Sequence, residues 1–312
     1  MGGSLKIGLY VSGAGPSPDV LIDQVRAAAD AGLDSAYFSQ LLSWDALTVA
    51  ALSARAVPGI ELGTAIVQTY PRHPLALAGQ ALTVQAVSRA PFTLGIGPSH
   101  PQIIEGNFGY SYDQPARHIR EYLSVLRPLL RGEPVDHRGQ AVTASGIVDA
   151  AGVPAPSVLL SALGPVMLRT AGELADGTVT VWTGPELIGD YIAPTINRAA
   201  AAAGRLEPRI VATVVASVTD DPDGARQWVA EQLGFAASFP GYQAVLERQG
   251  RTGVAETIVA GDEDTVGQAL AAYAAAGTTE LVVGPIGDER ARARTLDLLA
   301  GLRKDLAPAP PA

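Results

Sequence analysis

The sequence predicts an α/β fold, a closed (β/α)8 or TIM barrel with insertions. Short apolar runs without polar alternation recur along the 312 residues, as expected for strands that are covered on both faces. Segments with helical spacing of apolar residues separate these runs, so strand and helix alternate along the chain. Eight such units in one chain favour a closed barrel over an open sheet.

The expected strands are short apolar stretches bounded by turn residues. They are residues 7–11, 36–39, 62–67, 92–97, 158–162, 178–182, 210–218 and 281–284. The expected helices have apolar residues on one face. They are residues 19–31, 45–56, 74–87, 118–130, a helix opening at Pro165, 186–203, 222–250 with an interruption near Pro240, 262–276 and 289–302. Gly32, Gly177, Gly204 and Gly277 are interpreted as helix caps.

Three segments interrupt the alternation and are predicted to be insertions. Residues 98–116 lack periodicity and are expected to form an ordered loop or lid, residues 132–156 a hairpin excursion, and residues 235–255 a further excursion. We therefore expect one domain over residues 1–306, followed by a disordered tail at residues 307–312, which contain only alanine and proline.

Composition narrows the classes of partner. The chain has no cysteine, which excludes disulfides, thiolate metal sites and cysteine nucleophiles. Its net charge of −9 argues against nucleic acid as a partner, because phosphate contacts need clustered Lys and Arg. No secretory signal and no apolar run of about 20 residues are present, so we expect a cytoplasmic protein without membrane contact. The four histidines lack metal-ligand spacing, so no metal site is expected.

The chain is organised around residues 61–74, a buried strand that runs into a loop bracketed by prolines. Tyr70, Arg72 and His73 follow the strand's carboxyl end, and in an α/β barrel that end binds cofactor and substrate. An ordinary strand followed by a proline turn explains these residues equally well.

Two further strand ends carry glycine-rich turns. The run 94–100 is not a dinucleotide fingerprint, because the third glycine and the later acidic residue are absent. It indicates either tight strand packing or a strand end open to a flat ring. The run 160–167 leads from a strand into a helix amino terminus, which is either an anion site or simple packing.

Two other positions allow two interpretations each. Trp182 ends a strand and belongs either to the core or to the wall of a substrate pocket. The cluster Arg117, His118 and Arg120 is interpreted as a solvated helix start, with contact to an acidic cofactor tail as the alternative.

From Ile7 to about Leu302 these motifs, in this order, resemble the bacterial luciferase-like flavin and deazaflavin oxidoreductases. The resemblance implies a TIM barrel that binds a flavin or deazaflavin across the carboxyl ends of its strands. It implies a non-proline cis peptide bond at Ala65–Ile66 behind the ring. It further implies a set of cofactor-binding residues: Ser39, Ala65, Ile66, Gly97, Pro98 and Ser99 at the ring, with Ala162, Leu163, Gly164 and Met167 at the phosphate.

The resemblance also implies roles near the substrate. His100 would donate a hydrogen bond to substrate or ring, and Tyr112 and Trp182 would exclude water from the substrate pocket. Relatives place an acidic residue or a histidine where this sequence has Ser39 and Gln40, so no proton carrier is expected there and Gln40 is an orienting amide.

The runs 69–74, 95–100 and 162–165 resemble the branch of the family that uses coenzyme F420. We expect hydride transfer between F420 and a small organic substrate, with reduction of an activated C=C or C=N bond. An FMN-dependent monooxygenase on the same fold is the alternative, and a non-catalytic relative that binds cofactor or a partner protein is a third possibility. Family analogy predicts a homodimer.

Overall fold

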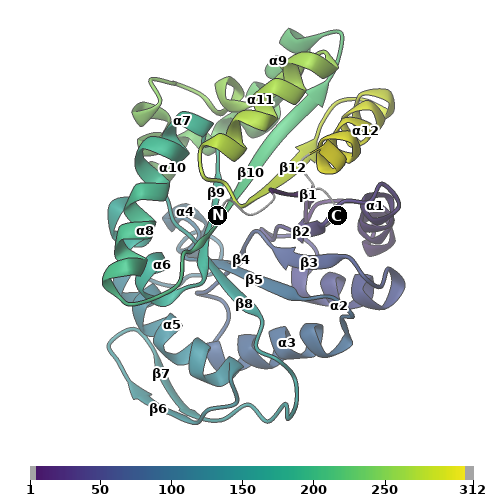
Figure 1. Cartoon of the computed structure of the whole chain (residues 1–312). Coiled ribbons are helices and arrows are strands. Elements are labelled where there is room, and N and C mark those ends of the chain that lie inside the picture. The colour runs from purple at the N-terminus through teal and green to yellow at the C-terminus, as the bar shows by residue number, and fades with distance from the viewer. Residues whose placement is uncertain (1–4, 306–312) are drawn as a thin grey trace.

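The computed structural model describes residues 5–305 and shows parallel strands closed into a barrel (Figure 1). The barrel strands are β1 (Lys6–Val11), β2 (Ser35–Phe38), β3 (Glu61–Thr64), β5 (Phe92–Gly97), β8 (Ser157–Ser161), β9 (Gly177–Val181), β10 (Arg209–Val218) and β12 (Glu280–Pro285). Each pairs with the next in parallel, and β12 pairs with β1, which closes the ring. The predicted TIM barrel is confirmed. The tail predicted at residues 307–312 lies outside the described residues.

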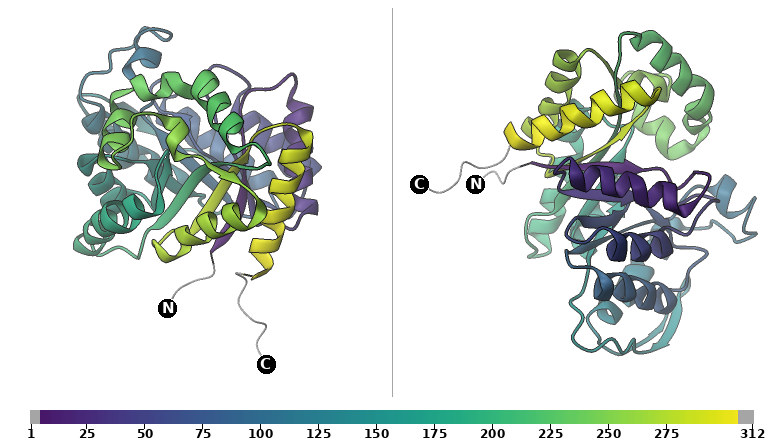
Figure 2. Two further views of the ribbon diagram at one scale, coloured as in Figure 1. Left: turned by 90° about the horizontal axis from the view of Figure 1, so that it is seen from above. Right: turned by 90° about the vertical axis from the view of Figure 1, so that its right-hand side faces the viewer.

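Helices surround the barrel on its outside (Figures 1 and 2). They are α1 (Pro18–Asp30), α2 (Ala46–Ala56), α3 (Pro74–Val87), α5 (Pro115–Leu130), α6 (Pro165–Leu174), α8 (Ala193–Ala202), α11 (Glu263–Ala275) and α12 (Glu289–Asp305). Figure 2 shows α12 beside α1, so the last helix completes the ring next to the first. No helix in this part of the chain is long and apolar enough to cross a bilayer.

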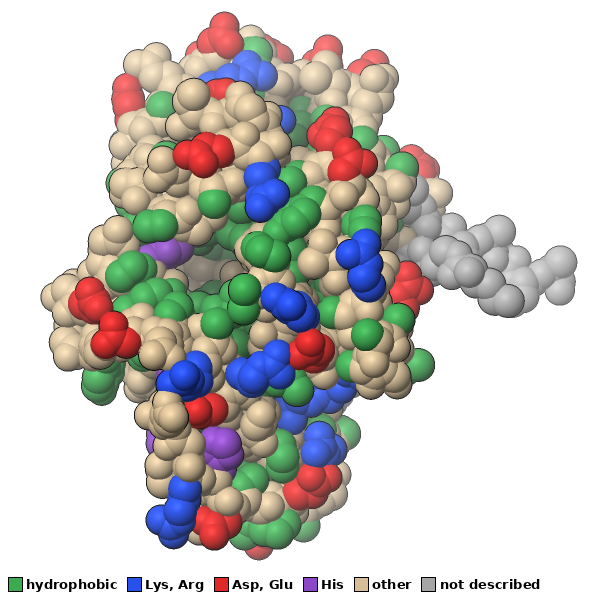
Figure 3. Space-filling model, turned by 90° about the vertical axis from the view of Figure 1, so that its left-hand side faces the viewer, with side chains coloured by type: hydrophobic (Ala, Val, Ile, Leu, Met, Phe, Trp, Pro, Cys, Tyr) green, Lys and Arg blue, Asp and Glu red, His purple; other side chains and the backbone are tan. Residues whose placement is uncertain are grey.

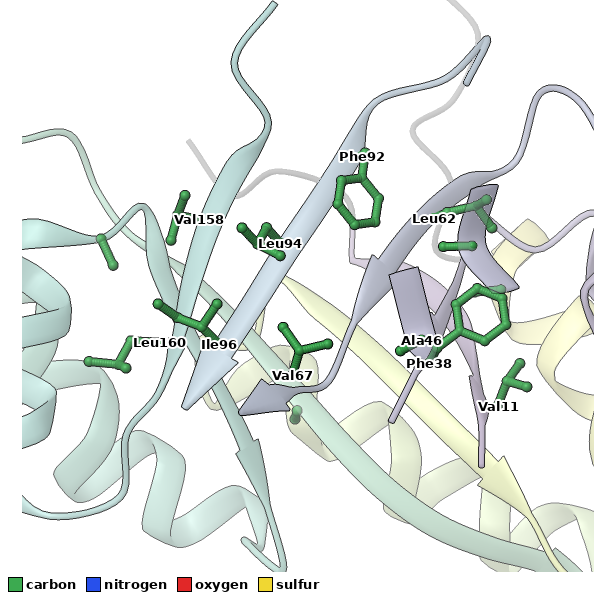
Figure 4. Close-up of a cluster of buried hydrophobic side chains, with 14 of the residues drawn as sticks. Val11, Phe38, Ala46, Leu62, Val67, Phe92, Leu94, Ile96, Val158 and Leu160 are labelled. Atoms are coloured by element: carbon green, nitrogen blue, oxygen red, sulfur yellow. The ribbon is translucent and has the colours of Figure 1, made fainter. Parts of the chain in front are cut away.

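The main core lies between the strands and the helices. Alternate residues of β5 point outward, and Figure 4 shows Phe92, Leu94 and Ile96 in the same apolar cluster as Val158 and Leu160 of β8. These side chains are almost fully buried. Burying each contributes roughly 1.5–3 kcal/mol to folding.

The barrel interior is layered. Its middle is filled by side chains from five different strands: Tyr37, Leu159, Val179, Val211 and Val282. Tyr10, Ala65 and Ile66 pack on this layer from the carboxyl end. Gly63 leaves space for the Tyr37 ring, because a Cβ at Gly63 would lie 2.3 Å from Tyr37 Cε1.

Three element predictions are corrected. The strand predicted at residues 62–67 is broken after Thr64, and β4 (Val67–Gln68) resumes pairing with β5. The short strand β11 (Val259–Gly261), which pairs with the outer end of β10, was not predicted. Gly177 does not cap α6, which ends at Leu174. Gly177 opens β9, and a Cβ there would lie 2.1 Å from Arg209 O.

The insertions form small elements. The predicted hairpin consists of β6 (Val135–Arg138) and β7 (Thr143–Gly146), which pair in antiparallel fashion. The short helix α4 (Pro101–Ile104) lies within the loop 98–116. The helix expected at 186–203 consists of α7 (Pro185–Leu187), a π-helix (Ile188–Ile192) and α8.

Between β10 and β11 the chain forms what we call the cover segment, residues 222–258. It contains α9 (Pro222–Leu233), the 3-10 turn Gly234–Ser238, α10 (Pro240–Arg248) and the 3-10 turn Val254–Thr257. Its own apolar cluster packs against Trp182, Val215 and Ile286. The cover segment therefore lies over the carboxyl ends of β9, β10 and β12.

Candidate functional site

A backbone bulge separates β3 from β4 at the carboxyl end of the barrel. The Ala65–Ile66 peptide bond in it is cis, as the family resemblance predicted. Ala65 N donates to Phe38 O at 2.8 Å and Gln40 N donates to Ile66 O at 3.2 Å, so the end of β2 holds the bulge.

Two glycines of β5 make room for this bulge. A Cβ on Gly95 would lie 1.9 Å from Thr64 O, and one on Gly97 would lie 3.2 Å from Ile66 Cδ1. Larger residues at either position would displace the bulge or the Ile66 side chain. The glycine pair of the run 94–100 therefore serves a close approach of two chain segments at the barrel mouth.

The turn after β5 places His100 against the cover segment. Ser99 adopts a left-handed backbone with φ 63°, which is uncommon for a residue other than glycine. The His100 ring stacks on Phe239 with ring centres 4.0 Å apart, and the Tyr242 ring meets it edge-on at 4.7 Å. Burial lowers the pKa of His100 to about 4, so at neutral pH the ring is uncharged and offers one donor and one acceptor.

The turn from β8 into α6 contains Ala162, Leu163 and Gly164, and Met167 lies in the first turn of α6. No side chain caps the amino terminus of α6. No atom lies within 4 Å of a Cβ built on Gly164. Backbone N–H groups and the helix dipole at such an end favour a negatively charged ligand group, so the turn suits a phosphate.

The predicted residues at the end of β2 are held by neighbouring loops. Ser39 Oγ accepts from Gly13 N at 3.0 Å. Gln40 Oε1 accepts from Ala46 N at 2.9 Å and from Arg72 Nη2 at 3.0 Å. Gln40 therefore helps to fix the start of α2, and only its amide nitrogen remains to orient a ligand.

The side chains that follow β4 contact different parts of the structure. Arg72 pairs with Asp45 at the start of α2. His73 caps α3 through Leu75 N and lies 2.8 Å from Thr143 O of the hairpin through Nε2. Of the three residues noted in the sequence, only Tyr70 joins the aromatic side chains at the mouth.

A stack of three aromatic rings borders the turn after β5. The Tyr70 ring lies 3.9 Å from the ring of His118 and 5.3 Å from that of Tyr112. Tyr112 Oη donates to Ser99 O at 2.7 Å, so Tyr112 supports the left-handed residue beside His100. Tyr70 Oη is buried without a partner among residues 5–305, and burial raises the pKa of Tyr70 to about 12.

The interpretation of His118 as part of a solvated helix start is wrong. His118 is 8% exposed, and its Nε2 lies 3.0 Å from Thr69 Oγ1. Arg117 and Arg120 do face outward, where they bind Gln140 and Glu173. The helix begins at Pro115, three residues earlier than expected from the apolar pattern alone, and positions 118 and 122 then share the buried face. The spacing to Tyr122 was the signal that could have identified His118.

Trp182 follows β9 with a left-handed backbone, φ 58°. Gln249 of the cover segment supports it. Gln249 Nε2 donates to Trp182 O at 2.9 Å, and Gln249 Oε1 accepts from Gly184 N at 2.7 Å. Trp182 itself packs in the apolar cluster of the cover segment. Sequence reasoning missed Gln249, because Trp182 and Gly184 lie more than sixty residues earlier in the chain.

These elements form one face of the molecule. Figure 3 views the side on which α4, α6, α8 and α10 lie in Figure 1, and the surface is hollowed there. Hydrophobic side chains and a histidine border the hollow. Within residues 5–305, no group of three or more His, Asp or Glu side chains is arranged to hold a metal ion.

Comparison with known families decides the relationship. The model of the luciferase-like monooxygenase family matches residues 5–284. The chain belongs to this family. The resemblance noted in the sequence is thereby confirmed.

Several relatives span nearly the whole chain. A putative coenzyme F420-dependent oxidoreductase of Mycobacterium tuberculosis is 28% identical, over 94% of this chain and 98% of the relative. An F420-dependent glucose-6-phosphate dehydrogenase of Nocardia farcinica is 28% identical, over 98% of each chain. The solved structure of the F420-dependent tetrahydromethanopterin reductase of Methanopyrus kandleri matches with a TM-score of 0.81 and 25% identity, over 96% of this chain and 98% of the other.

Proposed function

We propose that this protein is an oxidoreductase that transfers a hydride between coenzyme F420 and an organic substrate. The relatives named above support the choice of cofactor. Each is described as F420-dependent, and each matches this chain over almost its full length. The observation that carries the proposal is a pair of neighbouring features at the barrel mouth. Gly95 and Gly97 accommodate the bulge, and the uncapped amino terminus of α6 follows β8, the strand that pairs directly with β5.

The residues present fit a flat ring with a phosphate-bearing tail. Ile66, Gly97 and the turn Pro98–Ser99 would support the ring, together with Ser39 and Ala65. The N–H groups of the turn Ala162–Gly164 and of Met167 would bind the phosphate. When bound, the deazaflavin supplies or accepts the hydride, and the protein contributes orientation and electrostatics.

The chain's own residues would position the substrate and keep water away. Neutral His100 donates or accepts one hydrogen bond at the substrate. Tyr112 fixes the backbone beside it, and Trp182 closes the pocket at the end of β9. We propose reduction of an activated C=C or C=N bond as the reaction. The homodimer is a further proposal, which the molar mass in solution tests.

Use of FMN by a monooxygenase is the second candidate, and the description of the matched family favours it. The two cofactors differ at the atom that exchanges the hydride. Flavin N5 permits oxygen chemistry, whereas carbon at that position in deazaflavin restricts the protein to hydride transfer.

Titration of the purified protein with F420 and with FMN separates the two candidates. We expect micromolar or tighter affinity for F420, and tight FMN binding without F420 affinity would contradict the proposal. Gly97→Ala should weaken F420 binding by about tenfold or more, because the added methyl would press on Ile66 Cδ1 at 3.2 Å and Ser161 Cβ at 3.1 Å and displace the Ile66 side chain proposed to support the ring. Gly79→Ala in α3 is the matched control, since no atom lies within 4 Å of its Cβ.

Turnover is tested separately with reduced F420 and a panel of enones and imines. Consumption of reduced F420 is followed by absorbance. Cofactor binding with no turnover on the whole panel would favour a non-catalytic relative.

A further inference from the structure

We propose that the substrate is an uncharged, largely apolar compound with a flat ring, received by a subsite made of His100, Phe239 and Tyr242. This inference rests on the proposed function, because it specifies the substrate class of the same site. It comes from the way the cover segment crosses the barrel mouth and from the distribution of charge there.

The cover segment spans the mouth from one side to the other. It packs on Ile286, directly after β12, and its Phe239 stacks on His100, three residues after β5. In the order of pairing, β5 and β12 lie on opposite sides of the ring. Substrate that reaches the centre of the mouth therefore passes beneath side chains of the cover segment.

The residues that directly follow most of the barrel strands are uncharged. The three residues that follow each of β1, β2, β4, β5, β8 and β9 include no Asp, Glu, Lys or Arg. The acidic residues after β10 and β12 are engaged elsewhere. Asp220 pairs with Arg294, Asp221 caps α9 through Gly224 N, and Asp288 caps the last helix through Ala291 N.

Two cations near the rim are also engaged. Arg251, whose Nη2 lies close to Gly184 after β9, donates through Nη1 to Glu256 O. Arg72 pairs with Asp45 and binds Gln40. His100 is uncharged at neutral pH because burial lowers its pKa to about 4. A phosphate or carboxylate on the substrate would lose its hydration beneath the cover segment without gaining a counter-ion, which is unfavourable.

The same residues suit an uncharged ring that carries one acceptor. Phe239 and His100 stack face to face, with their planes 15° apart, and Phe239 is 8% exposed. Phe239 therefore backs the partly exposed rings of His100 and Tyr242, which can receive a further ring. Tyr242 Oη makes no hydrogen bond within the described residues. Burial raises the pKa of Tyr242, so its hydroxyl remains protonated and can donate to a carbonyl oxygen or an imine nitrogen.

The first experiment measures binding without turnover, so that its result does not depend on the proposed reaction. Calorimetry compares a neutral cyclic enone with its carboxylate-bearing counterpart on protein loaded with F420, or on the protein alone if F420 does not bind. We expect the neutral compound to bind about 100-fold more tightly or more. Equal affinity for the two compounds, or preference for the carboxylate or for glucose 6-phosphate, would overturn the inference.

The second experiment locates the subsite. Phe239→Ala and the more conservative Phe239→Leu should weaken binding of the neutral enone by about tenfold. Trp228→Ala is the matched control, because Trp228 lies in α9 of the same segment and is 46% exposed. Tyr242→Phe should lower affinity for the enone and leave that for the corresponding hydrocarbon unchanged. Unchanged enone binding in Phe239→Leu and Tyr242→Phe would remove these residues from the subsite.

Discussion

The two ends of the barrel differ in the types of side chain that they carry. At the carboxyl end, aromatic rings, glycines and left-handed backbone surround the mouth. At the amino end, the Arg209 side chain donates hydrogen bonds to Thr93, Tyr37, Glu61 and Glu280, which come from four different strands. The comparison teaches that the deeply buried carboxylates Glu61 and Glu280 lie at the end away from the candidate chemistry, as expected if one end supports the fold and the other binds ligands.

The polar side chains around Arg209 at the amino end form hydrogen bonds mainly with one another. Glu280 accepts from Ser35 Oγ at 2.5 Å and Glu61 accepts from Lys6 Nζ at 2.6 Å. Burial alone would raise the pKa of Glu61, but Lys6 and Arg209 hold it below its usual value. A cavity of about 670 Å³ opens beside the network, and both carboxylates on its wall already have cationic partners.

The largest expected effect comes from breaking the network. Arg209→Met leaves Glu61 and Glu280 buried with less compensation, so the free energy of unfolding should fall by about 3–5 kcal/mol. Urea denaturation measures the change. Arg294→Met is the matched control, because its partners Glu263 and Asp220 are half or more exposed, and its loss should be much smaller. Equal losses in the two variants would contradict the comparison.

The next effect tests how the cover segment is attached. Gln249→Ala removes the hydrogen bonds to Trp182 O, Gly184 N and Val245 O and should cost about 2 kcal/mol of stability. Tryptophan fluorescence should shift toward longer wavelength as the end of β9 loosens. Gln243→Ala in the same helix is the control, since Gln243 binds only the exposed Glu247. A fluorescence spectrum identical to that of the unmodified protein would argue against this attachment.

The two ends should also differ in their response to acid. The pKa values of His100 and His118 are lowered from 6.5 to about 4 by burial, so between about pH 6.5 and pH 4 the unfolded chain binds protons that the folded chain does not. The free energy of unfolding should therefore decrease as the pH is lowered through this window, by up to about 1.4 kcal/mol per pH unit for each histidine. Denaturation midpoints at pH 7, 6 and 5 measure it. His118→Phe should flatten the slope, and an unchanged slope would exclude His118 as its source.

The smallest effect concerns the turn after β5. Tyr112→Phe removes one hydrogen bond, to Ser99 O, and should cost about 1 kcal/mol. Because Ser99 precedes His100, we expect KM for the substrate to rise more than kcat falls. Tyr110→Phe is the control, since Tyr110 is 49% exposed. A change in stability without a change in KM would limit Tyr112 to a structural role.

Much of the architecture could be predicted because local sequence patterns, such as apolar spacing and flanking prolines, indicate the strands and helices. Residues 74–87 and 92–97 have the bounds that apolar spacing and flanking prolines indicated. The strands β4 and β11 were too short to show a pattern of their own, and Arg209 meets Glu61 across 148 residues of sequence. The cis bond at Ala65–Ile66 became predictable only through the family resemblance, since its residue types carry no local signal.

The candidate site was predicted less completely than the fold. The strand ends that carry Gly97, His100, Gly164 and Trp182 were identified from their position after apolar runs. Phe239, Tyr242 and Gln249 were missed, because they reach the mouth only after the cover segment folds back over the barrel.

Strand β10 continues past its pairing with β12, and its last residues, Ser217 and Val218, pair with β11. The cover segment between these two strands is joined to the barrel by this strand pair, by Gln249 and by the stacking of Phe239 on His100. Because these attachments are few, we expect that replacing the segment with the equivalent piece of a relative would change the compounds accepted and leave the proposed cofactor site in place.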